Sequence, residues 1–353
     1  MSWVAVSASR RPALWRLGPT GMRRCLIRLC ALLLAASAGG VRAQGSTEGI
    51  LVDVPSLDRR ADGSPLPLRG HWFAAVAQAS TPAASSSAAS VVTSAPTSAP
   101  TGANPSAAPS AAPSAASSAA PPAAKAAPAV VLLHGCGGAY AANGKLNARL
   151  RDYARALNAE GWHALVLDSL QPRGEVELCT QKLGTRAVTQ TQRRRDALGA
   201  LAWLAARPDV KADKLALLGW SNGGSTVLAS TNRRHPEVRS APVQPALAVA
   251  FYPGCEADLK AGYEAGAPLL LLVGEADDWT PAAPCIALAK QAGAEIESYP
   301  GAFHGFDANA PVRHRADVPG GVNPGRGVHV GADPAARAAS RKRMLEFMRA
   351  RLR

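Results

Sequence analysis

The sequence is poor in aromatic residues and lacks a continuous basic stripe. Among 353 residues there are seven Trp, five Tyr and five Phe, whereas Lys and Arg outnumber Asp and Glu by 39 to 25. The basic residues are scattered, and a nucleic-acid-binding surface would instead cluster them and interleave them with aromatic residues. We therefore expect no nucleic-acid partner. The run Arg193-Arg194-Arg195 is interpreted as the solvated face of a helix whose buried stripe contains Leu198, Leu201, Ala202 and Ala205.

The first 43 residues contain seven Arg and no acidic residue. Their apolar run around residues 31–35 is much shorter than the ~20 residues of a membrane span. A charged start, a short apolar core and the ending Val41-Arg42-Ala43 are typical of a secretory signal peptide. We therefore predict a signal peptide at 1–43 and a periplasmic or secreted mature protein without a stable membrane span. The mature chain has 32 basic and 25 acidic residues, a net charge of about +7.

Residues 77–128 have no periodic apolar face, and Lys125 is their only charged residue. They consist almost entirely of Ala, Ser, Pro and Thr, which is typical of a disordered, partly polyproline-II segment. Residues 48–72, ahead of this segment, are too few for a domain but contain two predicted strands, 50–55 and 66–73. We therefore predict a single domain over 44–353, interrupted by a disordered insertion at 77–128.

Strands and helices alternate after this segment. Apolar runs predict strands at 130–133, 163–170, 215–219, 247–252, 269–274 and 295–299. Helices are predicted at 146–159, 186–206, 224–234, 282–292 and 335–349. The alternation predicts an α/β fold with a mostly parallel central sheet, helices on both faces and a leading β-hairpin.

The motif GWSNGG at 219–224 stands between a predicted strand and a predicted helix. Its G-x-S-x-G spacing is that of a nucleophile elbow, in which a tight turn pushes the hydroxyl of Ser221 out above the sheet. Glycine at 219 and 223 removes side chains that would collide with the packing of the strand and helix. A chain rich in Gly and Ser also produces this spacing by chance, so the motif needs support from other segments.

Two downstream strand ends provide an acid and a base. Asp277 follows the strand at 269–274, and His304 follows the strand at 295–299. The order Ser221, Asp277, His304 is that of an α/β-hydrolase triad.

The Gly-rich segment HGCGG at 134–138 follows the first strand after the insertion. In enzymes with a nucleophile elbow, such a loop and the residue after the nucleophile supply the oxyanion hole, which nominates the N–H groups of Cys136 and Asn222. His134 is expected to hold its loop by hydrogen bonding, because no partner ligands lie at the spacing of a metal site.

The motifs GWSNGG (219–224), GEADDWTP (274–281) and YPGAFHGF (299–306) resemble those of the dienelactone hydrolase family, with HGCGG (134–138) and DSLQPRG (168–174) in support. The resemblance covers most of residues 46–353 apart from the insertion. It implies an α/β-hydrolase fold and a serine-type carboxylic-ester hydrolase without a metal or organic cofactor. It assigns the nucleophile to Ser221, the acid to Asp277, rather than Asp278, and the base to His304.

Two positions depart from that family. Its well-known members have cysteine where this chain has Ser221, and a glutamate that touches the thiol where this chain has Gly135. The pair of a cysteine thiol and a neighbouring glutamate, which those members use, is therefore missing. We expect an ordinary serine esterase acting on a small-molecule ester or lactone. Two alternatives are open: a peptidase or acyltransferase with the same triad, and a non-catalytic envelope binding protein with a decayed hydrolase site.

Three side chains near the catalytic motifs are candidates for substrate contacts. Arg173 follows the strand at 163–170 and would meet an anionic part of the substrate, with a structural arginine as the alternative. Tyr140 and Trp279 are candidates for lining the pocket, with packing in the core or at the rim as the alternative. The Gly- and Pro-rich stretch 307–333 is expected to be a long surface loop.

Four cysteines remain after removal of the signal peptide, and spacing alone leaves three pairings open. In the sheet that the resemblance implies, Cys136 and Cys179 follow neighbouring strands, and so do Cys255 and Cys285. We therefore predict the disulfides Cys136–Cys179 and Cys255–Cys285. Four unpaired thiols are the alternative.

Overall fold

A computed structural model of the chain describes residues 48–60, 62–75 and 125–353. The signal peptide expected at 1–43 lies outside these residues, and so does the insertion expected at 77–128, except for its last four residues. Ala127 and Pro128 already belong to the first strand after it, so that strand begins earlier than the sequence predicts.

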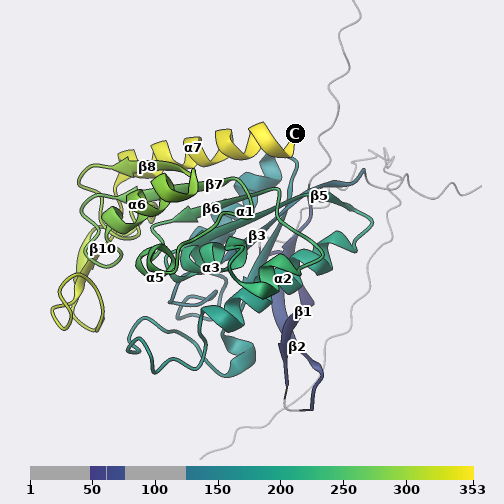
Figure 1. Ribbon diagram of the computed structural model, residues 1–353, viewed down its shortest axis with the longest axis horizontal. Helices are drawn as coiled ribbons and strands as arrows, with labels where there is room; N and C mark the ends of the chain where they lie inside the picture. Colours follow the sequence, from purple (N-terminus) through teal and green to yellow (C-terminus); the bar gives the residue numbers. More distant parts are fainter. Residues whose placement is uncertain (1–47, 61, 76–124) are drawn as a thin grey trace, which may run out of the picture. The chain divides into compact units, whose positions relative to one another are not determined.

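The eight strands of the main sheet lie in the order β1-β2-β4-β3-β5-β6-β7-β8 (Figure 1). The strands from β3 to β8 run parallel, and the antiparallel hairpin β1–β2 extends the sheet beside β4. This confirms the α/β-hydrolase fold with a mostly parallel sheet and a leading hairpin. The strands are β1 Ile50–Arg59, β2 Pro65–Phe73, β3 Ala127–Leu133, β4 His163–Asp168, β5 Val210–Trp220, β6 Leu247–Phe251, β7 Leu269–Gly274 and β8 Glu295–Tyr299.

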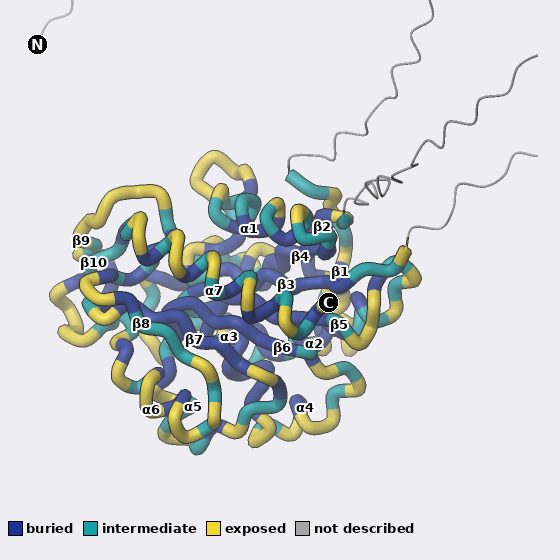
Figure 2. Tube along the Cα trace, turned by 90° about the horizontal axis from the view of Figure 1, so that it is seen from above, coloured by how far each residue is buried: buried dark blue, intermediate teal, exposed yellow. Residues whose placement is uncertain are grey.

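Helices cover both faces of the sheet. Val131 and Leu133 of β3 pack in the core with α2, α3 and α6, whereas Val130 and Leu132 pack with α1 and α7 on the other face. The central strands therefore form a buried layer between two sets of helices (Figure 2). The helices are α1 Ala148–Ala159, the 3-10 helix η1 Gln171–Arg173, α2 Gln190–Ala205, α3 Asn222–Thr231, α4 Pro236–Arg239, α5 Glu256–Lys260, α6 Ala282–Ala292 and α7 Pro334–Leu352.

The expectation that Arg193-Arg194-Arg195 forms a solvated face is wrong for two of the three residues. Arg193 is fully buried and Arg194 is 8% exposed. Both lie in the first half of α2, where a packed guanidinium finds partners: Arg193 binds the carbonyl of His134, and Arg194 binds Glu237. Arginine is tolerated in such positions when its N–H groups are hydrogen bonded.

The stretch 307–333 is not a plain surface loop. It contains an antiparallel hairpin of β9 Arg313–Arg315 and β10 Val328–Val330. Asp278 anchors this hairpin, because its carboxylate accepts the backbone N–H of His329 at 2.8 Å and contacts His329 Nδ1 at 2.7 Å. The hairpin is also joined to the loop after β8, where Val330 forms a β-bridge with His304.

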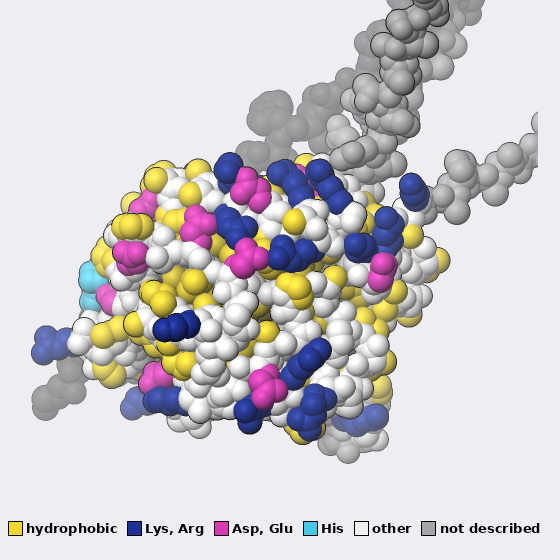
Figure 3. All heavy atoms as spheres, turned by 45° about the horizontal axis from the view of Figure 1, so that its top comes forward, with side chains coloured by type: hydrophobic (Ala, Val, Ile, Leu, Met, Phe, Trp, Pro, Cys, Tyr) yellow, Lys and Arg dark blue, Asp and Glu magenta, His cyan; other side chains and the backbone are white. Residues whose placement is uncertain are grey.

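Acidic and basic side chains are interspersed on the face of the molecule seen in Figure 3. Within the described ranges, no helix is both long enough and apolar enough to cross a membrane.

The two strands that flank the expected insertion end close together. Phe73 of β2 pairs with Ala164, and Ala129 of β3 pairs with His163, from opposite sides of β4. Because neighbouring strands lie about 4.8 Å apart, these ends are about 10 Å apart. A flexible linker of about eight residues reaches that far.

We therefore predict that replacing residues 77–124 with a Gly/Ser linker of about eight residues leaves the fold intact. Shortening a flexible connection lowers its closure cost by only ~0.6 kcal/mol per halving, so the free energy of unfolding should be unchanged or slightly raised. Urea unfolding of both proteins, followed by circular dichroism, measures this. A large loss of stability would show that the segment takes part in the fold.

Candidate active site

Ser221 lies at the sharp turn between β5 and α3 with φ 53° and ψ −120°. Positive φ is unusual for a residue other than glycine and costs of the order of 1–3 kcal/mol, so the surrounding structure has to enforce it. The Ser221 N–H donates to the carbonyl of Phe251 in the neighbouring strand β6 at 2.9 Å. This contact fixes the turn at the carboxyl edge of the sheet.

Two glycines make the turn possible. A Cβ atom on Gly219 would lie 2.2 Å from the carbonyl oxygen of Gly223, and a Cβ atom on Gly223 would lie 2.0 Å from the carbonyl oxygen of Leu133. Both distances are far inside van der Waals contact. The motif's glycines are therefore required by the close approach of α3 to the ends of β5 and β3.

His304 and Asp277 meet Ser221 from two other loops at the same edge. His304 Nε2 lies 2.8 Å from Ser221 Oγ, and His304 Nδ1 lies 2.8 Å from Asp277 Oδ2. Asp277 and His304 are each 4% exposed. When Nδ1–H donates to the carboxylate, Nε2 is free to accept the proton of the serine hydroxyl. The loops after β5, β7 and β8 thus place a hydroxyl, a carboxylate and an imidazole in one hydrogen-bonded chain.

Both oxygens of the Asp277 carboxylate accept hydrogen bonds from its own turn. Its Oδ1 accepts the backbone N–H groups of Trp279 at 2.9 Å and Thr280 at 2.8 Å, and its Oδ2 accepts the Thr280 hydroxyl at 3.0 Å. Asp278 points elsewhere, to His329. The two adjacent acids therefore have different partners, and Thr280 is a contributor that the sequence reasoning missed.

A buried polar network supports the His304 ring. The Tyr252 ring packs against it with a centroid distance of 4.7 Å, and the Tyr252 hydroxyl donates to Asp307 Oδ1 at 2.5 Å. Asp307 also accepts from Arg149 Nη1 at 3.1 Å and from Trp220 Nε1 at 2.9 Å. Burial raises the pKa of Tyr252 well above its usual value, which keeps this hydroxyl protonated as a donor. No sequence motif pointed to this network, because its members are far apart in the chain.

His134 holds the Gly-rich loop. Its fully buried ring places Nδ1 2.8 Å from the Gly135 carbonyl, and its Nε2 accepts the Ser169 N–H at 3.3 Å. Burial lowers the pKa of His134 to about 3, so the ring is neutral. This geometry matches the loop-holding role expected from the sequence.

The two amides nominated for the oxyanion hole flank Ser221. Asn222 is the first residue of α3, where backbone N–H groups have no partner within the helix. The loop of Cys136 also reaches the serine, because a Cβ atom on Gly135 would lie 3.5 Å from Ser221 Cβ. Their assignment as oxyanion donors stays a prediction.

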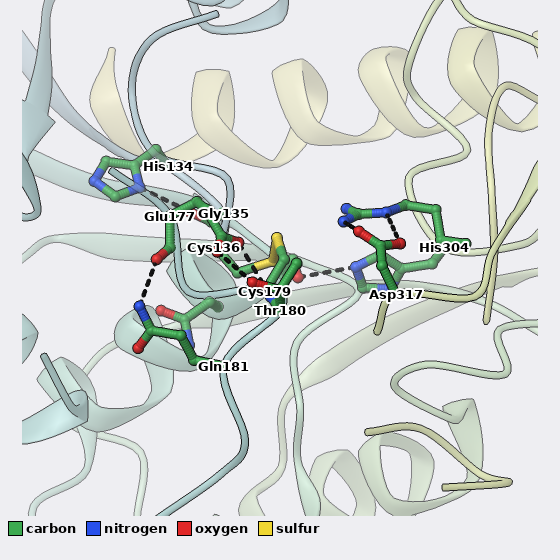
Figure 4. Close-up of a disulfide and its surroundings, with 12 residues drawn as sticks. His134, Gly135, Cys136, Glu177, Cys179, Thr180, Gln181, His304 and Asp317 are labelled. Carbon is green, nitrogen blue, oxygen red and sulfur yellow. Dashed lines mark hydrogen bonds and ion pairs between the residues drawn. A yellow bond between two sulfur atoms is a disulfide. The ribbon is translucent and has the colours of Figure 1, made fainter. Parts of the chain in front are cut away.

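Two disulfides connect loops at the carboxyl edge of the sheet, the edge at which Ser221 lies. Cys136 bonds to Cys179 and Cys255 bonds to Cys285, with Cα atoms 5.0 Å apart in both pairs. These are the pairs expected from the sheet, in which β3 neighbours β4 and β6 neighbours β7. Figure 4 shows the first disulfide between the His134 loop and His304.

A cavity of about 290 Å³ opens over Ser221 and His304. The Cys136–Cys179 disulfide and Trp279 form part of its wall, and the Trp279 ring lies 4.7 Å from the His304 ring. Trp279 therefore lies in the cavity wall, and its contact with a substrate stays a prediction. The cavity is also lined by Arg149, Arg313, Arg315, Ala308, Ala310, Pro311 and Val330.

Arg173 and Tyr140 lie away from this cavity lining. Arg173 binds both oxygens of the Asp196 carboxylate, at 2.9 and 2.8 Å, and also Asp58 at 3.1 Å and the Ser169 carbonyl at 2.8 Å. Its guanidinium is occupied by protein groups, so Arg173 is a structural arginine rather than a substrate contact. Tyr140 donates or accepts a hydrogen bond with His71 Nε2 at 3.1 Å.

In the part of the chain that the structure describes, no three His, Cys, Asp or Glu side chains are grouped to hold a metal ion.

A family model described as the dienelactone hydrolase family matches residues 115–352. No curated protein matches the sequence. A dienelactone hydrolase-like promiscuous phosphotriesterase from metagenomic libraries is 18% identical, with a TM-score of 0.52 over 86% of this chain and 99% of that chain. A dipeptidyl peptidase 4 from Porphyromonas gingivalis is 13% identical, with a TM-score of 0.51 over 86% of this chain and 35% of that chain. At these identities the two structures show a common fold.

The disulfides lead to a stability prediction. They close loops between residues 43 and 30 positions apart, and each should contribute about 2–4 kcal/mol to the free energy of unfolding. Peptide mapping without reductant should recover Cys136 linked to Cys179 and Cys255 linked to Cys285. Comparing urea unfolding of the double Cys→Ala variants measures each contribution. Free thiols, or a Cys179–Cys255 link, would contradict the pairing.

Proposed function

The chain belongs to the dienelactone hydrolase family, and from that premise we propose that it is a serine hydrolase that cleaves carboxylic esters or lactones. The observation that carries this proposal is the hydrogen-bonded chain from Ser221 Oγ through His304 to Asp277, with 2.8 Å at both steps. Hydrolase activity in general follows from the family. The nucleophile, the acid and the substrate class are our proposal.

In the first half-reaction Ser221 Oγ attacks the carbonyl carbon of the ester while His304 Nε2 takes its proton. Asp277 keeps Nδ1–H of the ring pointed away from the serine and stabilises the imidazolium that forms. The four hydrogen bonds to the Asp277 carboxylate support this role, because they hold it in one orientation.

The tetrahedral intermediate carries a negative charge on the former carbonyl oxygen. The N–H groups of Cys136 and Asn222 stabilise this charge by donating hydrogen bonds to it. When the intermediate collapses, the leaving alcohol takes the proton from His304, and an acyl-enzyme remains. Water then repeats the two proton transfers and releases the acid.

The cavity supports a small substrate. Its volume of about 290 Å³ is at the lower end of ligand pockets, and Trp279 and Val330 give it apolar walls. At position 135 a side chain would lie directly against Ser221, and glycine there leaves the hydroxyl to ordinary serine chemistry without a neighbouring carboxylate. The proposed mechanism uses no cofactor.

The same proposal includes the protein's location and organisation. Two disulfides favour an oxidising compartment. Together with the expected signal peptide at 1–43, they support a periplasmic or secreted protein. Its single hydrolase domain would extend over 44–353, with the insertion at 77–128 as a dispensable segment.

Peptidase or acyltransferase activity with the same triad is an alternative, and so is a non-catalytic binding protein. A similar structure is that of a promiscuous phosphotriesterase, so phosphotriesters are useful probes besides carboxylic esters and peptides. A fluorophosphonate separates catalysis from binding, because it reacts only with an activated serine.

We predict that a fluorophosphonate labels Ser221 in the wild-type protein and fails to label Ser221→Ala. Ser221→Ala and His304→Ala should each lower kcat for a small ester by roughly 10⁴–10⁶, with little further loss in the double variant, because the triad acts as a unit. Ester hydrolysis by the three variants measures this. If the kcat losses of the two single variants multiplied in the double variant, the assignment would be contradicted.

Asp277 and Asp278 form a matched pair for testing the acid. Asp277→Asn should lower kcat by about 10⁴, because the amide favours the wrong tautomer of His304. Asp278→Asn should cost far less, since its partner is His329. The two kcat values, measured on the same ester, decide the assignment, and the reverse ranking would overturn it.

A further inference from the structure

Arg193 is a buried cation without a carboxylate of its own. Within the described residues, no acid forms an ion pair with it. The two nearby acids have other partners: Asp196 pairs with Arg173, and Asp168 caps the turn of Leu170. Burial lowers the pKa of Arg193 to about 10, with partial compensation from Asp196 and Asp168, so the side chain is still charged at neutral pH. Its Nε has no hydrogen-bond partner. Burying a charge of this kind costs free energy unless hydrogen bonds compensate, so the groups that Arg193 binds define its role.

The guanidinium joins two segments at the catalytic edge. Nη2–H donates to the carbonyl of His134 at 2.8 Å, and Nη1–H donates to Asn222 Oδ1 at 2.5 Å. The first segment is the Gly-rich loop of Cys136, and the second is the start of α3 next to Ser221. Because the guanidinium is planar and rigid, these two contacts fix the separation of the segments.

The Gly-rich loop is fixed at three successive carbonyls. The His134 carbonyl accepts from Arg193, the Gly135 carbonyl lies 2.8 Å from His134 Nδ1, and the Cys136 carbonyl accepts the Leu178 N–H at 2.7 Å. Peptide groups are planar, so the Gly135 carbonyl fixes the direction of the Cys136 N–H in its own peptide group, and the His134 carbonyl held by Arg193 fixes the peptide group just before it. Arg193 therefore acts on the Cys136 N–H through the adjoining peptide group.

We propose that Arg193 is a positioning residue of the oxyanion hole: by bridging the His134 carbonyl and the Asn222 side chain it sets the separation of the two segments that carry the N–H groups of Cys136 and Asn222. The inference rests on the proposed function. It gives the buried guanidinium a role in the transition state that differs from general support of the fold.

Arg193→Met and Arg193→Lys test the proposal on a small ester and on a trifluoromethyl ketone, which forms a tetrahedral adduct with the serine. Displacing the N–H groups by about 1 Å should lower kcat about 10²-fold in Arg193→Met with KM nearly unchanged. The inhibition constant of the ketone should rise by a similar factor, because the adduct carries the oxyanion. Lysine keeps the charge but lacks the planar guanidinium that binds two groups at once, so the losses of kcat and of ketone affinity in Arg193→Lys should be intermediate.

Arg194→Met is the matched control. Arg194 is the next residue of α2, is also buried, and pairs with Glu237 at 2.7 Å, away from both loops. The loss of this pair should lower the unfolding temperature while kcat per active site, counted by fluorophosphonate titration, stays at the wild-type value.

The proposal is overturned if Arg193→Met lowers only the unfolding temperature and the number of titratable sites, with wild-type kcat and ketone inhibition. Should Arg193→Met be insoluble, Arg193→Lys decides, and wild-type kcat and inhibition in that variant overturn the proposal equally. Failure of the wild-type protein to react with the fluorophosphonate at Ser221 contradicts the proposed function instead.

Discussion

The site depends on one steric constraint, the absence of room for side chains at Gly219 and Gly223. The start of α3 approaches the ends of β5 and β3 so closely that a Cβ atom at either position would lie about 2 Å from a backbone oxygen. That approach forces Ser221 into positive φ and raises its hydroxyl above the sheet edge. It also brings the Gly-rich loop after β3 against the serine. The geometry of the proposed nucleophile and of both candidate oxyanion donors follows from this contact.

The remaining parts of the site are loops, and buried polar groups hold them in place. Asp307 accepts hydrogen bonds from Tyr252, Trp220 and Arg149. These bonds fix the loop that carries His304. Thr280 does the same for Asp277 within its own turn. Such networks are costly to bury unless nearly every member is satisfied, and in exchange they define a single arrangement. Two disulfides add covalent restraint to the loops at the same edge.

The hairpin β9–β10 shows how a segment outside the sheet takes part in the site. Asp278 holds it through His329, and its strands contribute Arg313, Arg315 and Val330 to the cavity. The acid next to Asp277 therefore shapes the pocket without joining the hydrogen-bonded chain to Ser221. Adjacent residues leaving a strand point in different directions, which is why two neighbouring carboxylates serve different parts of the site.

The sequence by itself determined the strands and the strand ends at which Ser221, Asp277 and His304 lie, whereas the cysteine pairs also required the strand order that the family resemblance implies. Apolar periodicity and glycine spacing are local signals, and parallel strands bring their carboxyl ends to one edge whatever the loops contain. Tertiary structure alone decided which polar side chains are buried. The basic run predicts that Arg193 is a surface residue, but the first turn of α2 packs against two loops, and Arg193 is buried there. Arg173 and Tyr140 stand near the motifs in sequence, but Asp196 and His71 bind them elsewhere. The partners of a long side chain come from distant segments, and no local pattern encodes them.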